Sequence, residues 1–298
     1  MSPSDRSVAP TAPARLRSYY ELTKSGIAVF AMMTAGVAHY VGAAGRVAPS
    51  ALIHTLVGTF VATAGALTLN QYLEREVDTR MERTRVRPIP SGRVSPGGAL
   101  AFGLILVAAG VLYLWLAVGA LPALLTLAAA AAYDLVYTPL KSRTFAAVLV
   151  GAVPGSMPAL IGWSAATGDL AAGALVLFAI GFLWQLPHVL SLAWLLKEDY
   201  ERAGFHMSPP NDPTGRIAGR HMVAYAALLV PVSLLPTLFG MTGIVYLGGA
   251  ALLGGGFLAV SVRARRGMER PAVRNVFLGS LLYPPLLFGL MILDTVRI

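Results

Sequence analysis

Two kinds of residue are scarce in this sequence. It contains no cysteine, so disulfides, thiolate-bound metals and cysteine-based redox centres are excluded. Charged residues make up only 12% of its 298 residues, whereas 56% are hydrophobic. A soluble domain of this size could not bury so much apolar surface, and the mean hydropathy of +0.67 is typical of an integral membrane protein.

The first twenty residues also lack something, namely the apolar core of a cleavable signal peptide. We therefore expect residues 1–20 to form a disordered cytoplasmic tail. Residues 21–298 then form a single membrane domain, because no later segment has the composition of a soluble domain.

Long apolar runs are abundant. A helix of about 17 to 25 apolar residues crosses a hydrocarbon core of about 30 Å. Barrel strands are shorter and alternate in polarity, so these runs predict an all-α polytopic protein with nine transmembrane helices. The runs lie near residues 24–43, 51–72, 97–118, 121–138, 145–164, 171–191, 221–240, 243–262 and 275–294.

The net charge of +9 is distributed unevenly along the chain. Nearly all lysines and arginines fall on one side of the predicted membrane, which follows the positive-inside rule. The orientation of the spans in the membrane therefore explains the excess of basic residues, and we expect the lipid bilayer rather than nucleic acid as the partner. The side with the N-terminus and the loops near 73–96, 139–144, 192–220 and 263–274 is predicted to be cytoplasmic, and the opposite side carries only Arg46 and Arg297.

Charge is most concentrated at the end of the second run, between Asn70 and Pro88, with four acids and five arginines. Asn70, Glu74 and Asp78 are four residues apart, so a helix would place them on one stripe. Converging oxygens of this kind suit Mg²⁺, which binds a few carboxylates and keeps sites for water and phosphate oxygens. The alternative is a helix end stabilised by ion pairs.

Guanidinium groups follow these acids immediately. Arg83 and Arg87, one turn apart, could share the oxygens of a diphosphate with a metal ion. Any single arginine here could equally be one of the positive charges that keep this loop on the cytoplasmic side. A second acidic site contains Asp199, at the cytoplasmic end of the sixth run. Two such sites on one membrane face could hold two metal ions around one diphosphate; a solvated loop is the alternative.

The end of the fourth run carries a further motif, Tyr133 to Lys141. Lys141 could reach a phosphate, and Tyr133 and Tyr137 could present their rings to a developing carbocation. An aromatic belt at the membrane interface would explain the tyrosines equally well. Asp134 lies inside the apolar boundary, and the sequence suggests no partner for it.

One histidine falls inside a predicted span. His188, which follows Trp184 by one turn, is either a hydrogen-bonded structural residue or a contact for a large polar substrate.

Together these blocks resemble the protoheme IX farnesyltransferase (haem O synthase) branch of the UbiA-type intramembrane prenyltransferases. The similarity extends from about Leu22 to Met207. Two departures are visible: Glu74 stands where the family often has Asp, and Ser25-Gly26 replaces a usual Pro-Arg. The matching blocks are Asn70-x-x-x-Glu74-x-x-x-Asp78, Arg83 to Pro88 with Ser91-Gly92, Tyr137 to Lys141, Pro154 to Trp163, Trp184 to His188, and Asp199-Tyr200 to Met207.

The resemblance implies a nine-helix bundle around a central cavity, and an enzyme in a bacterial inner membrane. It implies that farnesyl diphosphate, haem B and water give haem O and diphosphate, with haem as substrate and Mg²⁺ as cofactor. Haem A synthase or a terminal oxidase assembly would be partners downstream. In this reading Asn70, Glu74, Asp78 and Asp199 hold metal, Lys24, Arg83, Arg87 and Lys141 bind diphosphate, and Tyr133, Tyr137, Trp184, His188 and Tyr200 contact substrate.

Two rival functions follow from the same residues. A related prenyltransferase could act on a quinone precursor, with the same metal chemistry and a different acceptor. A haem-handling transporter could line an ion path with its acids, but such acids should be spread across the membrane, whereas these gather at one face.

Overall fold

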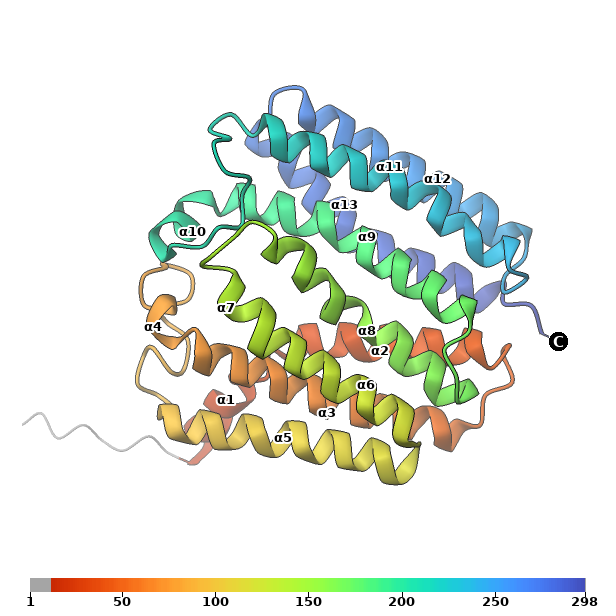
Figure 1. Ribbon diagram of the computed structural model, residues 1–298, viewed down its shortest axis with the longest axis horizontal. Coiled ribbons are helices and arrows are strands. Elements are labelled where there is room, and N and C mark those ends of the chain that lie inside the picture. The colour runs from red at the N-terminus through yellow and green to blue at the C-terminus, as the bar shows by residue number, and fades with distance from the viewer. Residues whose placement is uncertain (1–11, 298) are drawn as a thin grey trace, which may run out of the picture.

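The computed structural model describes residues 12–297, which are almost entirely helical (Figure 1). Within this range nine helical segments are long and apolar enough to span a membrane, which confirms the predicted fold class. They are α2 (Ser25–Gly42), α3 (Pro49–Leu73), α5 (Pro96–Ala117), the continuous segment Ala120–Leu140 made of α6 (Ala120–Ala131), η1 (Ala132–Tyr137) and α7 (Thr138–Leu140), α8 (Ala147–Thr167), α9 (Ala172–Leu195), α11 (Arg216–Leu238), α12 (Ile244–Arg265) and α13 (Arg270–Leu293).

Short helices lie outside the spans. Two of them, α4 (Arg75–Asp78) and α10 (Lys197–Ala203), follow the second and sixth spans. Figure 1 shows them together at one end of the bundle. The two acidic loops therefore lie on the same face, as the charge pattern predicted.

The N-terminal segment differs from the prediction of a disordered tail. Residues 12–20 are helical and belong to α1 (Ala12–Leu22), whereas residues 1–11 lie outside the described residues. Tertiary contacts explain the difference: Leu22 is fully buried beside Ile89 and Val94, and Glu21 pairs with Arg93 at 2.7 Å. Composition could not reveal these partners, because they come from the loop before α5.

Small residues set the closest helix contacts. At Gly162 of α8, an added Cβ would collide with the backbone carbonyl of Ala35 in α2. At Gly110 of α5, it would collide with Ala62 in α3. Lipid tails are as apolar as these side chains, so burying the side chains between helices gives little hydrophobic stabilisation. Close backbone packing is therefore a main source of helix association in membranes.

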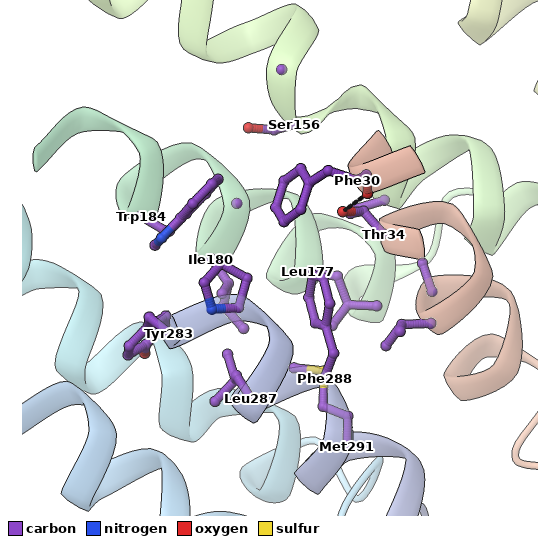
Figure 2. Close-up of a pocket in the computed structure, with 16 residues that line it drawn as sticks. Phe30, Thr34, Ser156, Leu177, Ile180, Trp184, Tyr283, Leu287, Phe288 and Met291 are labelled. Atoms are coloured by element: carbon purple, nitrogen blue, oxygen red, sulfur yellow. Dashed lines mark hydrogen bonds between the residues drawn. The ribbon is translucent and has the colours of Figure 1, made fainter. Parts of the chain in front are cut away.

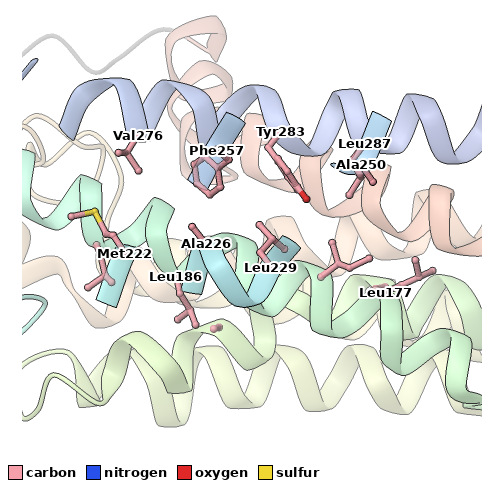
Figure 3. Packing of buried hydrophobic residues seen from close by; sticks show 14 of the residues in the cluster. Leu177, Leu186, Met222, Ala226, Leu229, Ala250, Phe257, Val276, Tyr283 and Leu287 are labelled. Carbon is pink, nitrogen blue, oxygen red and sulfur yellow. The ribbon is translucent and has the colours of Figure 1, made fainter. Parts of the chain in front are cut away.

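The largest buried cluster lies in the second half of the chain, where α9, α11, α12 and α13 pack together (Figure 3). Met222, Leu229, Phe257, Val276 and Leu287 are all buried there. Leucines on the outer surface are exposed instead, as expected of helices that face lipid. The second half therefore supplies most of the apolar core, and α10 brings it to the polar end where α3, α4 and α7 also lie.

Candidate active site

Asn70 joins three elements near the end of α3. Its side chain is 1% exposed; Oδ1 accepts a hydrogen bond from Lys24 Nζ at 2.9 Å, and Nδ2 donates to Thr138 Oγ1 at 3.0 Å. Lys24 precedes α2 and has φ 44°, a left-handed conformation that is unusual outside glycine. Burial and the nearby Arg87 lower the pKa of Lys24 to about 7.

Glu74 stands at the junction of α3 and α4. The helix breaks here, yet the backbone bonds from Glu74 N to Asn70 O and from Asp78 N to Glu74 O keep all three predicted ligands in order. Its buried carboxylate accepts a hydrogen bond from Lys141 Nζ at 2.5 Å. Burial alone would raise the pKa of Glu74, but Lys141 and Lys24 outweigh it, so the pKa lies below the usual value.

Asp78 ends α4 and is fully buried. Both of its carboxylate oxygens accept hydrogen bonds from Arg87 Nη1, at 2.8 and 2.7 Å. Thr84 Oγ1 donates to the backbone carbonyl of Asp78 at 2.9 Å, which ties the following loop to the helix end. Of the two arginines that the spacing singled out, Arg87 is therefore built into the acidic cluster, whereas Arg83 is exposed.

Asp199 occupies a different environment on α10. Its carboxylate accepts hydrogen bonds from Arg202 and from the backbone N–H of Glu82, the latter at 3.4 Å. Arg202 also reaches the carboxylate of Glu82 at 3.7 Å. The bond to Arg202 lowers the pKa of Asp199, and the charge of Arg83 contributes. The second acidic loop thus contacts the first one through the segment after α4.

Aromatic rings lie beside the ammonium group of Lys141. Lys141 Nζ lies 4.5 Å from the centroid of the Tyr137 ring and 5.7 Å from that of Phe205. Tyr133 and Tyr137 lie 5.3 Å apart, and Tyr137 fits against α8 only because residue 151 is glycine. Tyr200 packs edge-on against Phe205 at 5.9 Å. These contacts place the predicted tyrosines beside the ionic cluster rather than in a lipid-facing belt.

Trp184 and His188 lie deeper, on α9. Trp184 lines an apolar pocket between α2, α8, α9 and α13, and Figure 2 shows it with Phe30 at that pocket. The rings of Trp184 and His188 stack at 5.5 Å, and His188 Nδ1 contacts Ser280 Oγ at 2.8 Å. Because the Ser280 hydroxyl donates to the carbonyl of Phe277, it accepts from Nδ1–H, which leaves Nε2 of the neutral ring with a free lone pair.

No group of three Asp, Glu, His or Cys side chains stands ready to hold a metal ion among residues 12–297. Glu74 and Asp78 each hold a cation of the protein instead. Their oxygens nevertheless fit Mg²⁺, because this ion needs only one or two carboxylates when phosphate oxygens and water complete its shell. Asn70, Glu74 and Asp78 supply such donors on consecutive turns.

Several residues of this region were not singled out from the sequence. Thr138 belongs to a motif that was noted for Lys141, so its contact with Asn70 could have been suspected. Ser280, the partner of His188, lies in the last span and carried no signal. Glu82 and Arg202 had the appearance of ordinary loop charges.

Sequence comparisons identify the family of this chain. The model of the UbiA prenyltransferase family matches residues 31–284. The protoheme IX farnesyltransferase of Solibacter usitatus is 46% identical over 295 residues, covering 94% of this chain and 99% of the relative. That of Sorangium cellulosum is 44% identical, covering 83% of this chain and 88% of the relative.

Solved structures share the fold at low identity. A structure described for digeranylgeranylglyceryl phosphate synthase aligns with a TM-score of 0.78 at 16% identity, covering 95% of this chain and 99% of that one. A UbiA homologue from Archaeoglobus fulgidus bound to GPP and Mg²⁺ aligns with a TM-score of 0.62 at 13% identity, covering 92% and 99%. With nine spans among its described residues, one polar end and a family match over most of its length, the chain belongs to the UbiA prenyltransferase family.

Proposed function

We propose that this protein is a protoheme IX farnesyltransferase: it transfers the farnesyl group of farnesyl diphosphate to a vinyl group of haem B, adds water, and releases haem O and diphosphate. The observation that carries this proposal is the largely buried cluster of Lys24, Asn70, Glu74, Lys141 and the Asp78–Arg87 pair at the polar end of the bundle. Near-full-length relatives of that name support the acceptor.

Diphosphate binding follows from the way the cluster is paired. The ammonium of Lys141 and the guanidinium of Arg87 now neutralise Glu74 and Asp78. An arriving diphosphate offers these cations phosphate oxygens, which bind Arg in the same forked geometry as a carboxylate. The freed carboxylates can then hold Mg²⁺, which would stabilise the charge on the departing diphosphate.

Asp199 and Arg83 complete the mouth of this site. Asp199 lies against the segment after α4, so a rotation of Arg202 away from it would expose a carboxylate to the same diphosphate. Arg83 is exposed beside it and is free to follow the leaving group. Tyr200, which packs beside Phe205 next to Lys141, borders the same space.

The apolar parts of the substrates require the membrane interior. The pocket lined by Phe30, Trp184, Leu177 and Phe288 would take hydrocarbon, and it excludes water that would destroy an allylic cation. His188 Nε2, the free nitrogen of a ring fixed by Ser280, is proposed to face the haem. Tyr133 and Tyr137 offer ring faces to the cation as it forms.

The orientation in the membrane follows from the loop charges. The end that carries α4 and α10 also carries most of the arginines, so it would face the cytoplasm of a bacterium, at the inner membrane. Haem A synthase or a terminal oxidase assembly would then receive the product.

The direct test uses purified protein in lipid nanodiscs with haem B, farnesyl diphosphate and Mg²⁺. We expect a more hydrophobic haem with the mass of haem O on chromatography, no product when EDTA replaces Mg²⁺, and none from a quinone precursor such as 4-hydroxybenzoate. Prenylation of the benzoate, with haem left unchanged, would overturn the assigned acceptor.

A further inference from the structure

One acidic side chain inside the membrane has no use in the scheme above. Among residues 12–297, Asp134 is the only acid whose buried carboxylate oxygens lack any hydrogen-bond partner. It is 5% exposed. A buried charge without a partner is expensive, and an ionisable residue at membrane depth generally marks a functional site. Asn70, Glu74 and Asp78 are equally buried, but each of them is paired.

The position of Asp134 ties it to the candidate active site. It lies in η1, a π-helical turn, and such turns are frequent at functional sites. Thr138, one turn later, accepts the hydrogen bond from Asn70, and Lys141 follows at the membrane boundary. Asp134 therefore lies about one turn deeper in the bundle than the Asn70–Thr138 contact. Three charged side chains act on its carboxylate. Lys24 precedes α2, Glu74 follows α3, and Lys141 follows α7.

The chemistry of the reactants identifies a partner for this carboxylate. A carboxylate needs a hydrogen-bond donor or a cation. The diphosphate is made of acceptors, while the farnesyl chain and the vinyl edge of the haem carry no N–H or O–H group. Water is the remaining reactant, and it is a donor. It is also the reactant that must lose a proton.

The geometry points to Asp134 as the group that binds this water and takes its proton, an inference that rests on the function proposed above. The bond between C1 of the farnesyl group and the diphosphate oxygen breaks, and its electron pair leaves with diphosphate. The vinyl group attacks C1, so a carbon–carbon bond forms and positive charge moves to the carbon next to the haem ring. The water oxygen bonds to that carbon, and its proton passes to the Asp134 carboxylate, which returns it to bulk water.

The test separates hydration from prenyl transfer. Wild-type protein, Asp134→Asn and Asp134→Glu are compared in nanodiscs with haem B, farnesyl diphosphate and Mg²⁺, with release of diphosphate and the masses of the haem products both measured. Glu269→Gln is the matched acid-to-amide control, because Glu269 is exposed in the loop before α13. Thermal unfolding reports whether each variant is folded.

For Asp134→Asn we expect haem O formation to fall by about 100-fold or more, the range for loss of a general base. Diphosphate release should fall much less, and a farnesylated haem lighter by one water should appear, because the cation then loses a proton instead of gaining a hydroxyl. Asp134→Glu should restore part of the hydrated product. Glu269→Gln should behave as wild type.

Three results would overturn the inference: unchanged haem O formation in Asp134→Asn, an equal loss of diphosphate release and haem O, or full recovery at high Mg²⁺, which would make Asp134 a metal ligand. If Asp134→Asn does not fold, Asp134→Ser takes its place, and unchanged haem O formation in that variant has the same consequence. A wild-type protein that makes no haem O at all would instead contradict the proposed function.

Discussion

The two acidic loops occupy the same end of the bundle but differ in construction. Asp78 is buried and held by Arg87 through both oxygens, whereas Asp199 is held by the half-exposed Arg202. Charge pairs buried in protein depend strongly on both partners, while exposed pairs contribute little. The first loop is therefore part of the folded frame, and the second is a surface element that can rearrange around a ligand.

The largest effect is expected for Asp78→Ala, because this residue both stabilises the fold through Arg87 and is proposed to hold Mg²⁺. Product formation should be abolished. The variant should also lose about 3–5 kcal/mol of stability, since Arg87 is left without its buried partner. Chromatography of haem products and thermal unfolding in detergent measure the two effects. Wild-type activity would remove Asp78 from the mechanism, and an unchanged unfolding midpoint would contradict its role in the frame.

Asp199→Ala should lose activity as completely but keep its stability. Within residues 12–297 its carboxylate accepts hydrogen bonds only from Arg202 and the backbone of Glu82, so we expect folding not to depend on it. The same two assays apply, with Glu198→Gln as a neighbouring exposed control. If Asp199→Ala were active, the second loop would have no part in holding the diphosphate.

A smaller effect concerns the dependence of stability on pH in protein freed of metal by EDTA. The pKa of Glu74 is lower in the folded protein than its usual value of 4.5, so the unfolded chain binds more protons in acid. The stabilising contribution is complete above pH 4.5 and is lost as pH falls through the lowered pKa. Glu74→Gln should flatten this acid limb, measured as unfolding midpoint against pH.

The control for that experiment is Glu76→Gln, two residues away and largely exposed. It should keep the slope of the wild-type protein. Equal slopes in both variants and the wild type would show that Glu74 and Lys141 do not form the buried pair in solution.

The smallest effect is expected for Arg202→Gln. This side chain joins Asp199 and Glu82 at the surface, so its loss should leave the unfolding midpoint within experimental scatter of the wild type. Arg87→Gln, the corresponding change in the first loop, should lower the midpoint clearly. A comparable loss in both would erase the difference between the two loops.

Much of this arrangement could be predicted from the sequence, because it depends on local composition. Hydropathy places each of the nine spans found in residues 12–297 within a few residues of its observed bounds. The spacing of Asn70, Glu74 and Asp78 predicts their order along one stripe, and this order survives the break at Glu74 through the backbone bonds. Both acidic loops were expected at one face, where Figure 1 places them.

Pairing across the fold could not be predicted. Lys141 and Glu74 are 67 residues apart, and His188 and Ser280 are 92 apart. Which cation meets which acid depends on how the spans are arranged, and single-sequence periodicity does not contain that information. The helix α1 escaped notice for the same reason, since its partners come from the loop before α5.

The link between Glu82, Asp199 and Arg202 has a consequence for how substrates enter and products leave. The two contacts that reach Glu82 from the second loop are long, at 3.4 and 3.7 Å, whereas the side chains around Asn70 are buried. The surface contacts between the two loops can therefore separate at a small cost in free energy, while the buried side chains around Asn70 stay in place. A bulky tetrapyrrole and a charged by-product could exchange through this opening without any rearrangement of the spans themselves.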